Sequence, residues 1–240
     1  MLTHLDLNKI LFLDIETVPL YSDFDKVPEI EKNYFSEKTA YQRKNEISPE
    51  NFYDRAGIWA EFGKIICISV GYFIPQTNPR EFRLKSFFGD ERKLLIGFRE
   101  LIESHFNSIK HRLCGHNAKE FDFPFIARRM LIHQITLPNT LQLFNKKPWE
   151  VPHLDTLHLW RFGDFKHYTS LKLMAYVLGI PSPKDDIDGS QVATVYYEEQ
   201  NLQRIISYCE KDVVTVAQVF LRLRKESLLR EEEIIFSQKK

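Results

Sequence analysis

Residues 10–17 read Ile-Leu-Phe-Leu-Asp-Ile-Glu-Thr, an apolar run that is rich in branched and aromatic residues. Such a run is typical of a buried β-strand. Two carboxylates, Asp14 and Glu16, interrupt its end. Alternate residues of a strand face the same side, with about 6.5–7 Å between their Cα atoms, so we expect the two acids to project together. Two anions near a core repel each other and lose hydration, and the stretch therefore predicts a divalent metal between them.

The composition indicates a soluble protein with a sizeable core. The chain has 240 residues, of which 43% are hydrophobic and 13% aromatic. This length suits one domain with insertions. The 33 basic and 33 acidic residues cancel, which argues against a protein that coats nucleic acid through a global basic field. An enzyme that holds a few phosphates locally agrees with this balance.

The three cysteines, Cys67, Cys114 and Cys209, predict free buried thiols. Each lies in an apolar segment, none belongs to a CxxC pair, and their number is odd. This favours a reducing compartment over a disulfide framework or a zinc site. Residues 1–6 show no basic region followed by an apolar one, and no run reaches the roughly 18 apolar residues of a membrane span. We therefore expect a cytoplasmic protein that does not engage a membrane.

The periodicity of the remaining chain predicts a mixed sheet flanked by helices. Further strands are predicted at residues 64–73, 81–88, 112–116 and 153–157. The turn at 75–79 is short enough to join the first two of these antiparallel. Helices are predicted to begin after Asp90, near Pro124, at Ser170 and before Ile205, and the last is long and amphipathic.

Three segments depart from this pattern. Residues 20–57 are polar with scattered aromatics, and we expect an insertion with helical pieces over one end of the sheet. Most of its aromatic rings should pack on the body, although some could form a platform for bases. Residues 181–195, with an acidic run at 185–188, are expected to form a polar loop. The charged tail from about 226 should continue the last helix or fray, and residues 1–240 are expected to form a single domain.

Two later segments carry further acids. Tyr208 and Asp212 are four residues apart, so they lie on one face of the last helix. Asp212 adjoins the buried stripe of that helix and needs a partner, which a metal shared with the acids of the first strand would supply. Asp122 follows Asn117 by five residues and lies on a turn that enters a helix, which makes it a further candidate.

In this order the residues resemble the three exonuclease motifs of the DEDD superfamily. The matching residues are Asp14, Ile15, Glu16 and Thr17 in the first motif, Asn117, Phe121 and Asp122 in the second, and Tyr208 and Asp212 in the third. The third motif resembles that of the tyrosine subgroup, because the histidine variant would need His where Ser207 stands. The resemblance runs from about residue 9 to 225. It is closest to stand-alone proteins similar to the proofreading exonuclease domain of family B DNA polymerases.

The resemblance implies an α/β, ribonuclease H-like fold: a mixed five-stranded sheet, its first three strands antiparallel, with helices on both faces. It also implies two Mg²⁺ or Mn²⁺ ions. Asp14 would bridge both ions, Glu16 and Asp212 would complete the first, and Asp122 would hold the second. Tyr208 would orient the attacking water.

The residue types suit this chemistry. Phosphodiester hydrolysis needs a nucleophile at neutral pH and a means of stabilising charge on the leaving oxygen, and two metals about 3.5–4 Å apart supply both. Mg²⁺ is a hard cation that prefers oxygen ligands, so carboxylates fit and cysteines do not.

The resemblance also implies the substrate. Thr17, Asn117 and Phe121 would place the terminal nucleotide of a single-stranded nucleic acid, DNA rather than RNA, for 3′–5′ exonucleolytic hydrolysis. A polymerase or repair partner would act in trans. Two alternatives stay open: an exonuclease that trims RNA, and a nucleic-acid-binding module without catalysis. Asp155 lies outside the three motifs and is expected to be structural.

Overall fold

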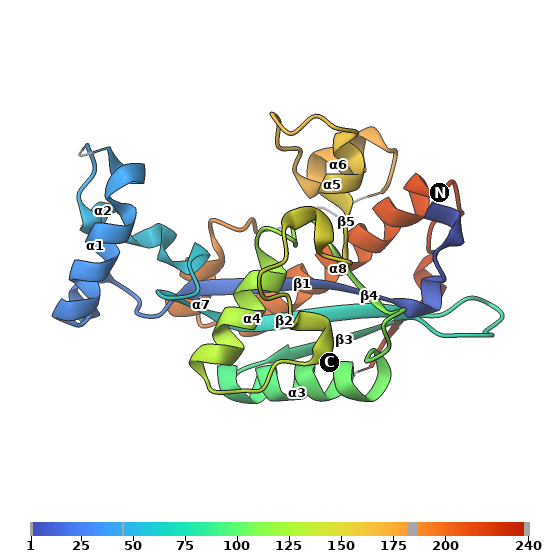
Figure 1. Ribbon diagram of the computed structural model, residues 1–240, viewed down its shortest axis with the longest axis horizontal. Helices are drawn as coiled ribbons and strands as arrows, with labels where there is room; N and C mark the ends of the chain where they lie inside the picture. The colour runs from blue at the N-terminus through green and yellow to red at the C-terminus, as the bar shows by residue number, and fades with distance from the viewer. Residues whose placement is uncertain (1, 45, 182–186, 238–240) are drawn as a thin grey trace.

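The computed structural model describes residues 2–44, 46–181 and 187–237, and a mixed six-stranded sheet forms its centre (Figure 1). The strands are, in chain order, β1 (Ile10–Pro19), β2 (Gly63–Phe73), β3 (Phe82–Phe88), β4 (Arg112–Gly115), β5 (Leu154–Asp155) and β6 (Ile234–Phe236). Their order in the sheet is β5-β4-β1-β2-β3-β6. β1, β2 and β3 are antiparallel neighbours, whereas β4, β5 and β6 join by parallel pairing. The predicted mixed sheet with three leading antiparallel strands is confirmed.

The sheet has six strands where five were expected, because the C-terminal tail adds one. β6 pairs parallel with β3, so the expectation that the charged tail extends the last helix or frays was wrong. Glu233 is buried and accepts hydrogen bonds from the Arg80 guanidinium at 3.2 Å and from the Arg230 backbone N–H at 2.8 Å. The long-range contact with Arg80 holds the tail against the sheet, and the local charge pattern does not reveal it.

Helices cover both faces of the sheet. α3 (Glu91–His105) and α4 (Asp122–Ile132) pack on one face, and α8 (Leu202–Leu223) packs on the other. The other helices are α1 (Glu29–Arg43), α2 (Pro49–Phe52), α5 (Thr156–Arg161), α6 (Leu171–Val177) and α7 (Val192–Tyr197). The predicted N-caps are present at Asp90 and Ser170, whose side chains accept the N–H groups of Lys93 and Leu173.

α7 corrects the expectation of a polar loop over residues 181–195. Val192 and Val195 are buried in a cluster with Val18 and Ile205. The helix has six residues, several of them β-branched or aromatic, and no side-chain cap, so its sequence favours a helix only weakly. Most of the expected acidic run, including Asp185 and Asp186, lies outside the described residues.

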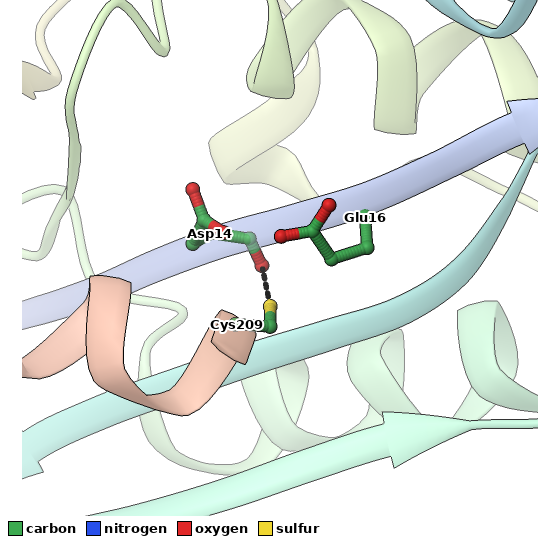
Figure 2. A group of neighbouring side chains, drawn as sticks. All are labelled: Asp14, Glu16 and Cys209. Carbon is green, nitrogen blue, oxygen red and sulfur yellow. Dashed lines mark hydrogen bonds between the residues drawn. The ribbon is translucent and has the colours of Figure 1, made fainter. Parts of the chain in front are cut away.

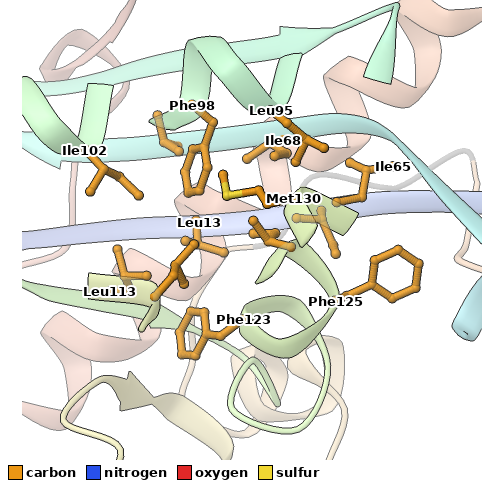
Figure 3. Packing of buried hydrophobic residues seen from close by; sticks show 14 of the residues in the cluster. Leu13, Ile65, Ile68, Leu95, Phe98, Ile102, Leu113, Phe123, Phe125 and Met130 are labelled. Atoms are coloured by element: carbon orange, nitrogen blue, oxygen red, sulfur yellow. The ribbon is translucent and has the colours of Figure 1, made fainter. Parts of the chain in front are cut away.

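β1 divides the core by simple alternation. Leu11, Leu13 and Ile15 face α3 and α4 in the cluster that Figure 3 shows. Ile10 and Phe12 face the other way and pack under α8. Because side chains alternate along a strand, the acids two and four residues beyond Phe12 continue the face that α8 covers.

Residues 20–57 contain α1 and α2, which project beyond the end of β1 (Figure 1). The expected helical pieces are present. Phe35, Phe52 and Tyr53 are buried, and they pack mainly on one another and on Phe62 in a small separate cluster. Tyr41 is 91% exposed on α1.

All three cysteines are free and buried, as expected. None of the helices in the described ranges combines the length and the apolar content that crossing a bilayer needs.

Candidate active site

The site lies at the carboxyl ends of three parallel strands, β1, β4 and β5. β4 pairs with β1 only between Ile10 and Phe12, so Asp14 and Glu16 lie beyond the end of this pairing. Asn117 follows β4 by two residues, and Asp155 is the last residue of β5. Ligands of open α/β sheets bind outside the carboxyl ends of the strands, where neighbouring connections leave in opposite directions. The topology therefore explains why these distant residues meet.

The two acids of β1 form the centre of the site (Figure 2). Glu16 is buried and Asp14 is partly buried. One ligand atom from each of Asp14, Glu16 and Cys209 lies within 4.8 Å of the other two. The Cys209 thiol donates to the backbone oxygen of Asp14 at 3.4 Å, so it supports the strand from the α8 side. A register shift between Glu16 and Thr17 ends the regular pairing with β2 just beyond the pair.

Asp122 enters the site because the chain turns sharply after β4. A Cβ on Gly115 would lie 2.5 Å from the Cβ of Ala118, so only glycine allows this close turn. The turn leaves the β1 backbone open at Ile15, whose N–H forms a hydrogen bond to the Asp122 carboxylate. Asp122 is buried at the start of α4, where the helix dipole also favours a negative charge.

Asp212 approaches the same place from α8. Its negative charge raises the pKa of Asp14, of Glu16 and of Asp122, and such an effect requires short separation in a buried site. The structure therefore brings together all four predicted acids.

Burial is the largest cause that holds the pKa of Asp14 and of Glu16 well above the usual range, and the neighbouring carboxylates add to it. Burial likewise raises the pKa of Asp122 to about 8. Within the described ranges, no salt bridge to Lys, Arg or His reaches the carboxylates of Asp14, Glu16 or Asp122. A set of buried carboxylates without a cationic side chain between them is suited to a divalent ion.

The other predicted residues surround the acids. Tyr208 is partly buried and packs against the cluster that contains Val18. The Thr17 hydroxyl donates to the backbone oxygen of Gly57 at 2.8 Å, which ties β1 to the segment before β2. Phe121 is partly buried at the start of α4 and packs on the core. Their contacts with a nucleotide stay predictions.

Asp155 has a structural role, as expected, and it stabilises the turn that carries the residues of the second motif. It is 1% exposed, and its carboxylate accepts the backbone N–H groups of Asn117, Lys119 and Leu157, each at 3.0 Å. Asn117 has a left-handed backbone with φ 59°, and no donor among the described residues reaches its buried side-chain oxygen. An acid between a strand and a helix reads as an ordinary N-cap, so sequence reasoning missed its link to the second motif.

Replacing Asp155 by alanine is expected to destabilise the protein. The buried N–H groups of Asn117 and Lys119 would lose their acceptor, and an unsatisfied buried group costs about 1–3 kcal/mol. Urea unfolding measures this free energy. Asp164→Ala, at an exposed position, is the control and should change stability by less than about 0.5 kcal/mol. Equal stability of both variants would contradict the role assigned to Asp155.

Comparisons with known proteins agree with this geometry. The sheet and the helices on its two faces form an α/β domain with a ribonuclease H-like fold. Residues 58–235 match the family described as "Predicted 3'-5' exonuclease related to the exonuclease domain of PolB", and the chain belongs to this family. The match contains the second and third motifs. The first motif precedes it, and the structure places that motif beside the other two.

Among solved structures, the family B DNA polymerase of the hyperthermophilic archaeon Pyrobaculum calidifontis is similar in fold. The TM-score is 0.54 and the identity 15%, over 87% of this chain and 23% of the polymerase chain. The protein thus spans about a quarter of the length of that polymerase, and the likeness concerns the fold alone. No curated protein matches the sequence.

Proposed function

We propose that the protein is a metal-dependent 3′–5′ exonuclease that removes nucleotides from single-stranded DNA ends with two divalent ions. The observation that supports this most is the convergence of Asp14 and Glu16 from β1, Asp122 from α4 and Asp212 from α8. Membership of a family of predicted 3′–5′ exonucleases supports the type of reaction.

The donor set fits hard divalent cations. The candidate ligands are carboxylate oxygens, and the nearby Cys209 thiol is engaged with the backbone of β1. Asp14 would be shared by both ions, with Glu16 and Asp212 on one side and Asp122 on the other. Bound there, the ions would supply an acidified water and stabilise the charge that develops on the leaving oxygen.

The remaining motif residues would position the reactants. A tyrosine hydroxyl, with an ordinary pKa near 10, is a poor general base, so Tyr208 would hold the attacking water by a hydrogen bond. The buried side-chain oxygen of Asn117 offers an acceptor to the terminal nucleotide. Thr17 and Phe121 would border the same nucleotide.

Tyr208→Phe is expected to slow hydrolysis by roughly 10- to 100-fold, because it removes one hydrogen bond worth about 1–3 kcal/mol. The ring and its packing are kept, so thermal stability and metal binding should not change. Rates under single-turnover conditions give the effect. Tyr176→Phe, at an exposed position on α6, should keep the wild-type rate. A wild-type rate in Tyr208→Phe would exclude Tyr208 from the reaction.

The proposal is tested with end-labelled single- and double-stranded DNA and RNA, offered with Mg²⁺, with Mn²⁺ or with chelator. The 5′-labelled single-stranded DNA should shorten stepwise, and the 3′-labelled strand should lose its label at the first step. Chelator should stop both reactions. Failure to cleave with either metal would contradict the enzyme assignment, and faster cleavage of RNA would contradict the choice of DNA.

A further inference from the structure

The segment between α5 and α6 carries three exposed aromatic rings. Phe162 is 87% exposed, Phe165 is 70% exposed and Tyr168 is 63% exposed. Figure 1 shows α5 and α6 standing out from the sheet on one side of the molecule. Large rings that gather on a surface commonly mark a binding site, because their exposure to water is unfavourable.

A partly buried histidine ties this segment to the acid site. His116 directly precedes Asn117, and its Nε2 lies 2.9 Å from the backbone oxygen of Thr169. Its Nδ1 lies 2.9 Å from the hydroxyl of Thr156 on α5. The His116 ring also contacts Tyr168 edge-to-face, with 6.2 Å between the ring centroids. The ring of Tyr168 is therefore fixed relative to the turn that carries Asn117.

Electrostatics place the Tyr168 hydroxyl near the acids. Partial burial raises the pKa of Tyr168, and the negative charges of Asp155, Asp122 and Asp212 raise it further. Two of these three acids, Asp122 and Asp212, belong to the proposed metal site. Tyr168 thus stands at the border of the site, and Phe165 and Phe162 lead away from it along the chain.

Basic residues flank the rings along the chain. The Arg161 guanidinium lies over the ring of Phe165, 5.3 Å from its centroid, and also pairs with Glu120. Lys166 and Lys172 are exposed on the same segment and at the start of α6. Exposed rings flanked by cations match the two features of an unpaired strand, which are its base faces and its phosphates.

We propose that Phe162, Phe165 and Tyr168 form a stacking surface for the bases of single-stranded DNA next to its terminal nucleotide. This inference rests on the proposed exonuclease function and states where the strand lies. The surface differs from the base platform that the sequence suggested within residues 20–57. Bases in a duplex are already stacked on one another, so the surface selects unpaired strands of any sequence.

The test compares the full chain carrying Phe162→Ala, Phe165→Ala and Tyr168→Ala together with the unaltered protein. Both proteins also carry Asp14→Asn so that the strand stays intact, and the protein with Asp14→Asn alone is the unaltered reference. Fluorescence anisotropy with a labelled oligothymidylate of about 12 nucleotides gives the Kd. Base–aromatic stacking contributes about 1 kcal/mol or more per base, so each ring should account for about fivefold or more in Kd and the triple variant should bind about 100-fold or more weakly. Binding to a blunt duplex should not change.

Matched controls are Tyr41→Ala on α1 and Tyr176→Ala on α6, whose side chains are 91% and 80% exposed. Each should bind the oligonucleotide within about twofold of the unaltered protein. Thermal unfolding checks that the triple variant folds, and the three single variants replace it if its stability falls. A Kd for the triple variant equal to that of the controls, or no binding by the unaltered protein, would overturn the inference.

A second readout, without Asp14→Asn, separates this inference from the exonuclease proposal. The p-nitrophenyl ester of thymidine 5′-monophosphate presents no neighbouring base, so the triple variant should hydrolyse it at the wild-type rate while its KM for DNA rises. If the triple variant loses DNA binding and the wild type hydrolyses neither substrate, the stacking surface is supported and the exonuclease proposal is contradicted. If the triple variant hydrolyses DNA with an unchanged KM, the exonuclease proposal is supported and the stacking surface is contradicted.

Discussion

Asp14→Asn and Asp212→Asn are each expected to reduce hydrolysis of single-stranded DNA by about 10³-fold or more. Metal ions contribute several kcal/mol to stabilising the transition state, and each 1.36 kcal/mol corresponds to a factor of ten in rate. An amide that replaces a carboxylate keeps the shape of the side chain but removes the charge that holds the ion. The charges of Asp212, Glu16 and Asp122 all raise the pKa of Asp14, so this acid should show the larger loss.

Single-turnover rates with Mg²⁺ and with Mn²⁺ measure the loss. Both variants should fold, because removing one negative charge from a crowded set of buried and partly buried carboxylates relieves repulsion. Asp25→Asn, an exchange of the same kind at an exposed position far from the site, should keep the wild-type rate. More than about a tenth of the wild-type rate in either variant would contradict the assignment of these acids.

Removing the metal is expected to make stability strongly dependent on pH. The pKa of Asp122 is raised to about 8 in the folded protein, against an ordinary value of about 4. Between these values the folded state binds more protons than the unfolded state, so the free energy of unfolding falls as pH rises. The cost of ionising the buried group is absent below the lower value and complete above the upper one. Asp14 and Glu16 act in the same direction.

Added Mg²⁺ or Mn²⁺ should reverse this effect. An ion that binds only the folded state stabilises it, by about 2.7 kcal/mol at one hundred times its Kd. The increase in Tm should be larger near pH 8 than near pH 5, because carboxylates must be ionised to bind the ion. Asp122→Asn should flatten the pH dependence in chelator. Thermal unfolding that is insensitive to metal at both pH values would contradict the metal site.

The parts of the site that follow from local periodicity were predictable. Alternation along β1 places Asp14 and Glu16 on one face, and helical spacing places Asp212 one turn beyond Tyr208. Both patterns depend only on the geometry of a single element. The order of the three motifs then indicated the family and, through it, the mixed sheet.

The parts that depend on contacts between distant elements were not predictable. β6 forms because Glu233 meets Arg80, far away in the sequence. Asp155 supports Asn117 across the ends of two neighbouring strands. The aromatic rings after α5 lie near the acids because His116 contacts the backbone of that segment. None of these pairings leaves a periodic trace in the sequence.

The most direct measurement is an anomalous difference map from crystals grown with Mn²⁺ and thymidine 5′-monophosphate. Two peaks are expected, both at coordination distance from Asp14, one also near Glu16 and Asp212 and the other on the side of Asp122. Peaks that avoid these carboxylates, or no peak at Mn²⁺ concentrations that support hydrolysis, would contradict a reaction carried out by cations that the four acids share.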